Sequence, residues 1–240
     1  MDSPPLILPV LTILFLSTLT RSTFGFGDAL VAMPLLTLLI GVKTASPLVA
    51  LYSTTIALVI VGGNWRSIDL KAAWRLILAS LVGIPFGLLL LKLAPEAWVK
   101  GILGGLLILF GLYNLSRPVL PSLDQPGWAY GFGFVAGVLG GAYNTNGPPV
   151  VIYGAMRRWL PTRFRATLQG YFVPTGGLIA ISHGLGGLWS AEVLRLYLLA
   201  LPLVLIAIFL GGKLNHRFPP ARFEKFLYLA LILLGLLLII

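Results

Sequence analysis

The sequence predicts an all-α, polytopic membrane protein made of two inverted-topology repeats, with about eight to ten apolar segments. Hydrophobic residues make up 58% of the 240 residues and charged residues only 10%. A water-soluble domain of this size would expose too much apolar surface. The apolar runs are mostly about 18 to 22 residues long, which is the length that a helix needs to cross the hydrocarbon core of a bilayer.

Two glycine- and proline-rich stretches interrupt the apolar runs and predict the two halves. One extends from Gly25 to Pro34 and the other from Gly140 to Pro149, and at an offset of 115 residues their ends coincide. Glycine and proline break helices and leave backbone groups unpaired. A bilayer tolerates such groups only inside protein or around a wet cavity, so paired breaks indicate a transporter's binding site.

Each half contains five apolar segments in the same order. In the first half we expect them at about 4–22, 24–41, 44–63, 73–92 and 98–115, and in the second at about 127–142, 147–157, 166–183, 192–212 and 223–240. The predicted organisation is therefore a first membrane repeat over 1–115, a proline-rich cytoplasmic linker over 116–126 and a second membrane repeat over 127–240.

Matches outside the breaks support the duplication. At an offset of 125 residues Pro95 falls on Pro220 and Lys100 on Lys225, so the second half carries an insertion of about ten residues relative to the first. Five segments is an odd number, so the two halves are expected to have opposite orientations in the bilayer.

The distribution of the 17 lysine and arginine residues predicts the orientation. If every segment crosses, 13 of the 17 fall on one side, and cytoplasmic loops are the ones that collect positive charge. That side has Arg21, Arg66, Lys71, Arg75, Arg117, Arg157, Arg158, Arg163, Arg165, Lys213, Arg217, Arg222 and Lys225, and the other has Lys43, Lys92, Lys100 and Arg195. We expect a multi-pass protein of the inner (cytoplasmic) membrane with both termini outside, whether the breaks cross fully or re-enter.

The same distribution argues against nucleic-acid binding, because the basic residues lie in separate short loops without interleaved aromatic residues. No cysteine is present and the two histidines are far apart, so we expect no metal site and no cofactor. An enzyme is disfavoured: Ser182 and His183 are adjacent on a helix and point about 100° apart. No Walker-type motif is present to bind ATP.

Several motifs resemble those of a known family. They are Arg21-Ser-Thr-Phe-Gly-Phe-Gly27 and Met33-Pro-Leu-Leu36 in the first half, and Gly137-Val-Leu-Gly-Gly141, Asn146-Gly-Pro-Pro149, Val150-Val-Ile-Tyr153 and Arg163-Phe-Arg-Ala-Thr-Leu-Gln169 in the second. With them the sequence resembles the TauE/SafE family of sulfite exporters over nearly the whole chain. The resemblance implies movement of sulfite, organosulfonates or related small anions across the cytoplasmic membrane.

The candidate substrate-binding residues lie at the two breaks. They are Arg21, Gly25 and Gly27 at the first and Asn144, Thr145, Asn146 and Gly147 at the second. A guanidinium can hold an oxoanion through paired hydrogen bonds, and a helix amino terminus favours an anion. The alternatives are an arginine that extends to the lipid interface and amides that merely cap the next helix.

Asp28 is the only acid inside an apolar run. It is a candidate for proton coupling, and equally for a structural partner of Arg21 or a helix cap. His183 is expected at the membrane interface rather than in a proton relay, and Tyr143 at the pocket wall or at an interface.

The sequence thus favours a secondary carrier that exports a small anion, with the lipid bilayer as its surroundings. An anion channel of the same architecture stays open as the alternative. The small-residue face formed by Gly101, Gly104 and Gly105 is expected to serve helix packing, with a homodimer contact as a second use.

Overall fold

The computed structural model describes residues 4–64, 70–116, 120–214 and 220–240, and ten α-helices and no strands occur in these ranges. The helices are α1 (Pro4–Phe24), α2 (Asp28–Ile40), α3 (Val42–Asn64), α4 (Leu70–Leu93), α5 (Glu96–Ser116), α6 (Trp128–Tyr143), α7 (Gly147–Met156), α8 (Pro161–Leu185), α9 (Ala191–Leu214) and α10 (Pro220–Ile239). Of the basic residues in the expected loops, Arg66, Arg117 and Arg217 lie outside the described residues.

The helices confirm the predicted polytopic membrane class. Among the described residues, α1, α3, α4, α5 and α9 are long and apolar enough to span a bilayer. α2 and α7, the helices that follow the two breaks, have only 13 and 10 residues, so neither reaches across about 30 Å of hydrocarbon alone.

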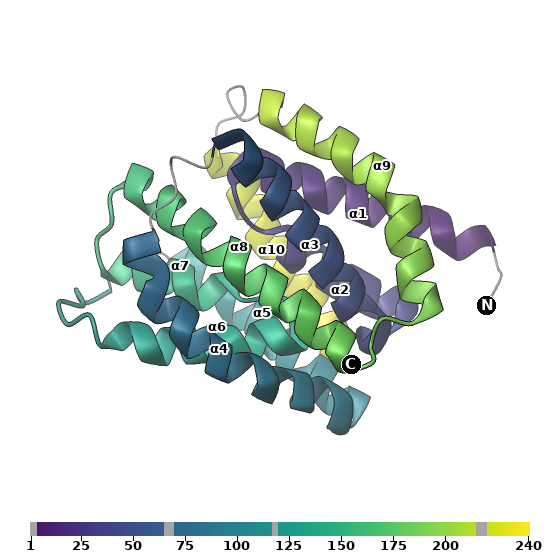
Figure 1. The fold of residues 1–240 in the computed structure, drawn as a ribbon, viewed down its shortest axis with the longest axis horizontal. Helices are drawn as coiled ribbons and strands as arrows, with labels where there is room; N and C mark the ends of the chain where they lie inside the picture. The colour runs from purple at the N-terminus through teal and green to yellow at the C-terminus, as the bar shows by residue number, and fades with distance from the viewer. Residues whose placement is uncertain (1–3, 65–69, 117–119, 215–219) are drawn as a thin grey trace.

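Helices of the first half pack mainly against helices of the second (Figure 1). α4 packs along α6 and α1 along α9, α5 pairs with α10, and α3 pairs with α8. With five helices in each half, α4 matches α9 and α1 matches α6. The contact between α4 and α6 therefore corresponds to the contact between α9 and α1. The centre of the fold is therefore formed by α3 and α8, with the short helices α2 and α7 beside them.

The close packing of α4 on α6 depends on glycines spaced four residues apart. Gly133, Gly137 and Gly141 lie on one face of α6, and a Cβ added to Gly137 would lie 2.7 Å from the Cα of Ser80 on α4. Such small-residue faces let backbones approach closely in membranes, where burial of apolar surface gives little drive for association. The predicted face on α5 is used in part: Gly104 packs against Gly235 of α10, whereas a Cβ on Gly101 or Gly105 would meet nothing within 4 Å.

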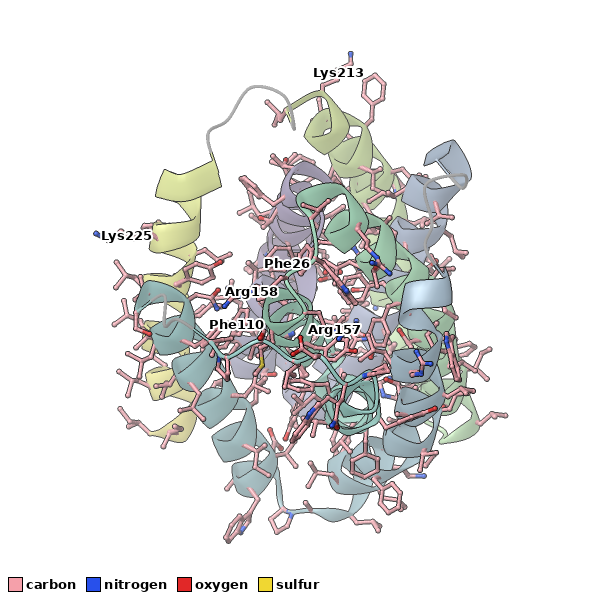
Figure 2. All side chains as sticks on the ribbon, turned by 90° about the vertical axis from the view of Figure 1, so that its left-hand side faces the viewer. Phe26, Phe110, Arg157, Arg158, Lys213 and Lys225 are labelled. Atoms are coloured by element: carbon pink, nitrogen blue, oxygen red, sulfur yellow. The ribbon has the colours of Figure 1, made fainter. Side chains whose placement is uncertain are left out.

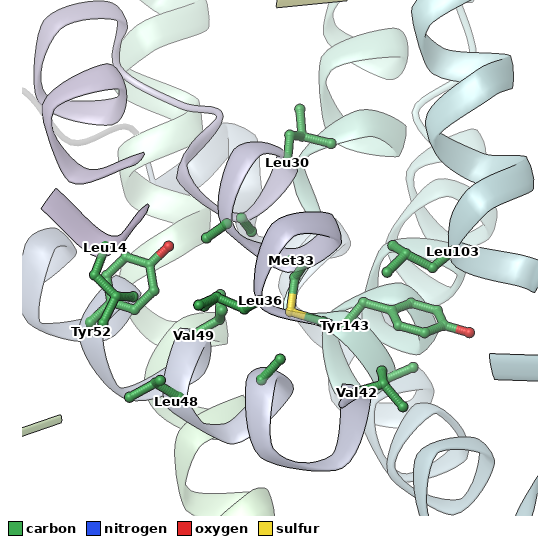
Figure 3. Packing of buried hydrophobic residues seen from close by; sticks show 14 of the residues in the cluster. Leu14, Leu30, Met33, Leu36, Val42, Leu48, Val49, Tyr52, Leu103 and Tyr143 are labelled. Atoms are coloured by element: carbon green, nitrogen blue, oxygen red, sulfur yellow. The ribbon is translucent and has the colours of Figure 1, made fainter. Parts of the chain in front are cut away.

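The largest apolar cluster surrounds α2 (Figure 3). Met33 and Leu36 of α2 are fully buried, with Val49 and Tyr52 of α3 on one side and Tyr143 of α6 on the other. The cluster therefore fixes the first short helix against the end of α6, where the second break begins.

The two breaks correspond at a different offset from the one that the sequence predicts. Each break has three residues, 25–27 and 144–146, and the helices that follow begin at Asp28 and Gly147, which are 119 residues apart. This spacing differs from the offset of 115 by four residues, about one helical turn. Gly140 lies inside α6, whereas Gly25 already lies outside α1, because glycine is accepted inside a helix where a close neighbour requires it.

The described part of the linker is attached to the carboxyl end of α7. Nη1 of Arg157 donates to the carbonyl oxygens of Leu123 and Asp124 at 2.6 and 2.7 Å, and the Leu123 N–H donates to the Met156 carbonyl oxygen at 3.0 Å. Nη2 of Arg158 donates to the Leu120 carbonyl oxygen at 2.9 Å. Arg157 and Arg158 lie together at this end of the molecule (Figure 2), so these positive residues also hold the linker in place.

We expect Gly137→Ala to destabilise the protein by about 1–3 kcal/mol, because the added methyl group overlaps the α4 backbone. Thermal unfolding in detergent measures the effect. Gly131→Ala on the same helix is the matched control, since its Cβ would meet nothing within 4 Å. Equal melting temperatures for the two variants would show that the α4–α6 contact is not this tight.

Candidate anion-binding site

The first break reverses the chain through two glycines. Gly25 and Gly27 have φ values of +90° and +101°, a region that residues with a Cβ rarely adopt. The Gly25 N–H still donates to the Arg21 carbonyl oxygen at 2.7 Å. The tight reversal places Arg21, near the end of α1, next to Asp28, the first residue of α2.

Arg21 and Asp28 form a buried ion pair. Nη1 of Arg21 lies 2.8 Å from Oδ2 of Asp28, and the two residues are only 4% and 6% exposed. The hydroxyl of Ser53 on α3 also donates to Oδ2 of Asp28, and the Ser53 carbonyl oxygen accepts from Nη1 at 3.3 Å. The pairing confirms the prediction that Asp28 is a structural partner of Arg21. The alternative of a helix cap is wrong, because the cap position is Gly27 and no side chain caps α2.

The other edge of the Arg21 guanidinium makes no hydrogen bond within the described residues. Nε and Nη2 are buried and donate to no acceptor among the described residues. These two N–H groups point in parallel from one side of the planar group, which is the arrangement that binds two oxygens of an oxoanion. Leaving them unpaired is costly, so the arginine is not merely a residue that extends to the lipid interface. The ring of Phe172 on α8 lies 5.3 Å from the guanidinium carbon and helps to hold it.

The second break places three polar residues in the interior. Asn144, Thr145 and Asn146 are all buried, and Asn144 has a left-handed backbone with φ +53°. The amide Nδ2 of Asn146 donates to the Thr175 hydroxyl at 3.3 Å, and that of Asn144 lies 3.5 Å from the Val49 carbonyl oxygen. Asn146 occupies the cap position of α7 but makes no capping hydrogen bond, so the interpretation of these side chains as mere caps is wrong.

The carboxyl end of α6 explains why this break is stable. A helix leaves its last four carbonyl oxygens without intrahelical partners. In α6 each of these four oxygens accepts a hydrogen bond from another group. Gly140 accepts from the Asn144 N–H at 2.7 Å and Tyr143 from the Thr145 hydroxyl at 3.0 Å. The remaining donors come from other helices: Ser46 of α3 donates to Ala142 at 2.8 Å, and Nε2 of His183 of α8 lies 2.7 Å from the Gly141 carbonyl oxygen.

His183 and Tyr143 both lie elsewhere than expected. His183 is fully buried rather than exposed, because its ring supplies the donor that the Gly141 carbonyl oxygen needs. The carbonyl is only an acceptor, so Nε2 carries the proton. Tyr143 is also fully buried in the apolar cluster around α2, so it lies neither at an interface nor along the cavity.

The two breaks face each other across one cavity. The cavity is small, with a volume of about 30 Å³. Its lining comes from both breaks and both central helices: Arg21, Phe26, Gly27, Asp28, Ala29, Leu30, Ser53, Asn144, Thr145, Asn146, Gly147, Pro148, Phe172 and Gly176. All the predicted site residues except Gly25 are among them, and Gly25 shapes the turn.

Both short helices point their amino termini at this cavity. Asp28, Ala29 and Leu30 begin α2, and the first N–H groups of a helix have no intrahelical acceptor. α7 begins with Gly147, Pro148 and Pro149, and prolines have no N–H. The first short helix therefore offers more backbone donors than the second, which contributes the side-chain amides of its break instead.

Sequence reasoning missed Ser53 and Phe172 as parts of the site. Ser53 is the twelfth residue of α3 and Phe172 the twelfth of α8, so the two residues occupy matching places in the two halves. The run Ser53-Thr54-Thr55 inside an apolar helix was a usable signal for the first. Phe172 had none, because an aromatic residue in an apolar run looks like ordinary packing.

A multi-pass protein whose two interrupted helices meet at a buried, charged cavity has the architecture of a secondary transporter. Comparison with known proteins narrows this class. The chain belongs to the family of sulfite exporters TauE/SafE, which it matches over residues 10–238.

Two relatives illustrate the family. The chain is 26% identical to the probable sulfite/organosulfonate exporter TauE of Cupriavidus necator. The alignment extends over 243 residues and covers 96% of this chain and 93% of that protein. The chain is 28% identical over 178 residues to the probable inner membrane transporter protein TsaS of Comamonas testosteroni, covering 73% of this chain and 74% of that protein. No solved structure matches the chain.

We expect His183→Ala to lower the free energy of unfolding by about 1–3 kcal/mol, because the Gly141 carbonyl oxygen would be left unpaired in the interior. His183→Gln keeps an N–H donor and should recover part of the loss. Denaturant unfolding in detergent measures both, with Ser182→Ala as the neighbouring control. A free energy of unfolding of His183→Ala equal to that of Ser182→Ala would contradict the assigned role.

Proposed function

We propose that this protein is a secondary transporter that exports a small sulfur-containing anion, such as sulfite or an organosulfonate, across the cytoplasmic membrane. The family and the names of the two relatives support this substrate class. Transport rather than catalysis fits the site, because its described lining residues include no histidine or cysteine, and the one serine among them, Ser53, donates a hydrogen bond to Asp28.

The observation that carries the proposal is the unpaired edge of Arg21. In this conformation Nε and Nη2 are closed off from outside, so an anion reaches them only when the cavity widens. Alternating access through rocking of the two halves supplies such a widening. The substrate then receives the guanidinium edge from the first break and amide donors from Asn144 and Asn146 of the second.

The expected outcome in proteoliposomes is saturable counterflow of radiolabelled sulfite or methanesulfonate. Arg21→Gln should lower the rate at subsaturating anion about tenfold or more, since charge-assisted hydrogen bonds are lost. Asn146→Ala should lower it less. Lys213→Gln, which removes a positive charge from an exposed residue, is the matched control.

The outcomes separate the competing functions. Flux without exchange would favour an anion channel, and conversion of the anion without flux would favour an enzyme. Normal counterflow in both Arg21→Gln and Asn146→Ala would remove these residues from the pathway.

Asp28 is proposed to couple anion movement to proton movement. Its carboxylate faces Arg21 of α1 and the hydroxyl of Ser53 on α3. Protonation would cancel the negative charge that Arg21 now neutralises, so a proton and an anion would favour each other's binding. We expect Asp28→Asn to transport without any dependence on a pH gradient, measured as initial rates with and without an imposed gradient. An unchanged dependence would assign Asp28 to structure alone.

The proposed orientation places the basic loops and the linker in the cytoplasm and both termini outside. The chain has no cysteine, so single cysteines can report it without background. Ser122→Cys in the linker should react with an impermeant maleimide only after the membrane is opened, and Ser190→Cys, between α8 and α9, in intact cells. The reverse pattern would invert the assignment.

A further inference from the structure

The cavity has no net charge before a ligand arrives. Arg21 and Asp28 are the only charged side chains among its described lining residues, and they neutralise each other at 2.8 Å. An anion site built only for attraction would contain the arginine without the acid. The Asp28 carboxylate should therefore affect which anions bind in the cavity.

The carboxylate is held in a fixed place. Oδ2 of Asp28 accepts from Nη1 of Arg21 and from the Ser53 hydroxyl, and the residue begins a helix whose cap is a left-handed glycine. The Asp28 carboxylate occupies one edge of the Arg21 guanidinium, and the ligand would occupy the adjacent edge. The ligand's charge would thus lie close to a second negative charge in a poorly solvated region.

We propose that Asp28 is a specificity-determining residue that limits the cavity to anions of single charge, such as an alkyl sulfonate or hydrogen sulfite, and rejects dianions such as sulfate. The inference rests on the proposed function, because it concerns the same cavity. While Asp28 is ionised, a singly charged ligand leaves ligand, arginine and acid together at −1, and a dianion leaves them at −2.

The physical reason is that the repulsion between ligand and Asp28 is proportional to the ligand's charge. Doubling the charge doubles the free energy of repulsion, so it squares the fold-change in affinity. The attraction by Arg21 also doubles for a dianion and offsets this repulsion, but the cost of removing an ion from water rises with the square of its charge, so a site without net charge favours the singly charged ligand. Replacing Asp28 alone, with Arg21 kept, should therefore change the affinities for the two classes of anion by different factors.

Methanesulfonate and sulfate form a suitable pair of probes, because a methyl group replaces one oxygen and the charge changes by one while the size stays similar. Affinities are measured from the shift in melting temperature of the detergent-solubilised protein at constant ionic strength, since ligands of the native state stabilise it. The wild type should bind methanesulfonate at least tenfold more tightly than sulfate.

Asp28→Asn should strengthen methanesulfonate binding about tenfold and sulfate binding about a hundredfold, consistent with one charge removed at short range in a protein interior. Asp28→Glu keeps the charge and should keep the preference of the wild type. Asp28→Ser, also neutral and acceptable at a helix start, replaces Asp28→Asn if that variant is not recovered folded.

The outcomes distinguish this inference from the proposed function. Binding of both anions with equal fold-changes in Asp28→Asn, or a wild type that prefers sulfate, would overturn the charge selection while leaving the anion site in place. Absence of any anion effect in wild type and variants would overturn the proposed function and this inference together.

Discussion

The buried ion pair between Arg21 and Asp28 is the interaction on which the rest of the site depends. Removing two charges from water is expensive, and their attraction offsets that cost only if the geometry is good and further hydrogen bonds are made. Here the Ser53 hydroxyl and carbonyl supply those bonds, and the reversal through Gly25 and Gly27 brings the two residues together. The pair satisfies one edge of the guanidinium and leaves the other free, so a structural element also becomes a candidate binding element.

The two breaks contribute different chemistry to one cavity. The first supplies the charges and the backbone N–H groups at the start of α2. The second supplies side-chain amides. It is stabilised at the carboxyl end of α6, where each of the last four carbonyl oxygens accepts a hydrogen bond. Ser46 and His183 provide two of these donors from α3 and α8, so the central helices both position the break and line the space beside it. A bilayer permits interrupted helices only where the freed backbone groups are buried in protein or line a wet cavity.

Much of this arrangement was predictable, because hydrophobic length and glycine–proline breaks follow directly from the bilayer's constraints. All ten segments and the meeting of the two breaks are confirmed by the structure. What the sequence could not show is how buried polar groups pair across long separations. His183 lies 42 residues from Gly141, and its neighbours in sequence suggested an interface. The start of the second break also differs from the prediction, because Gly140 lies inside α6 at a close helix contact. The inverted orientation of the halves stays a prediction.

The central claim is that both breaks hold one and the same anion. A crystal structure of the protein soaked with selenate or methylselenonate, heavier analogues of sulfate and methanesulfonate, tests it through the anomalous signal of selenium. The account predicts a peak for methylselenonate within about 4 Å of the Arg21 guanidinium and of the Asn144 to Gly147 segment, as expected for hydrogen-bonded oxygens around one central atom. Methylselenonate that is transported by the protein while its only peak lies away from both breaks would contradict the account.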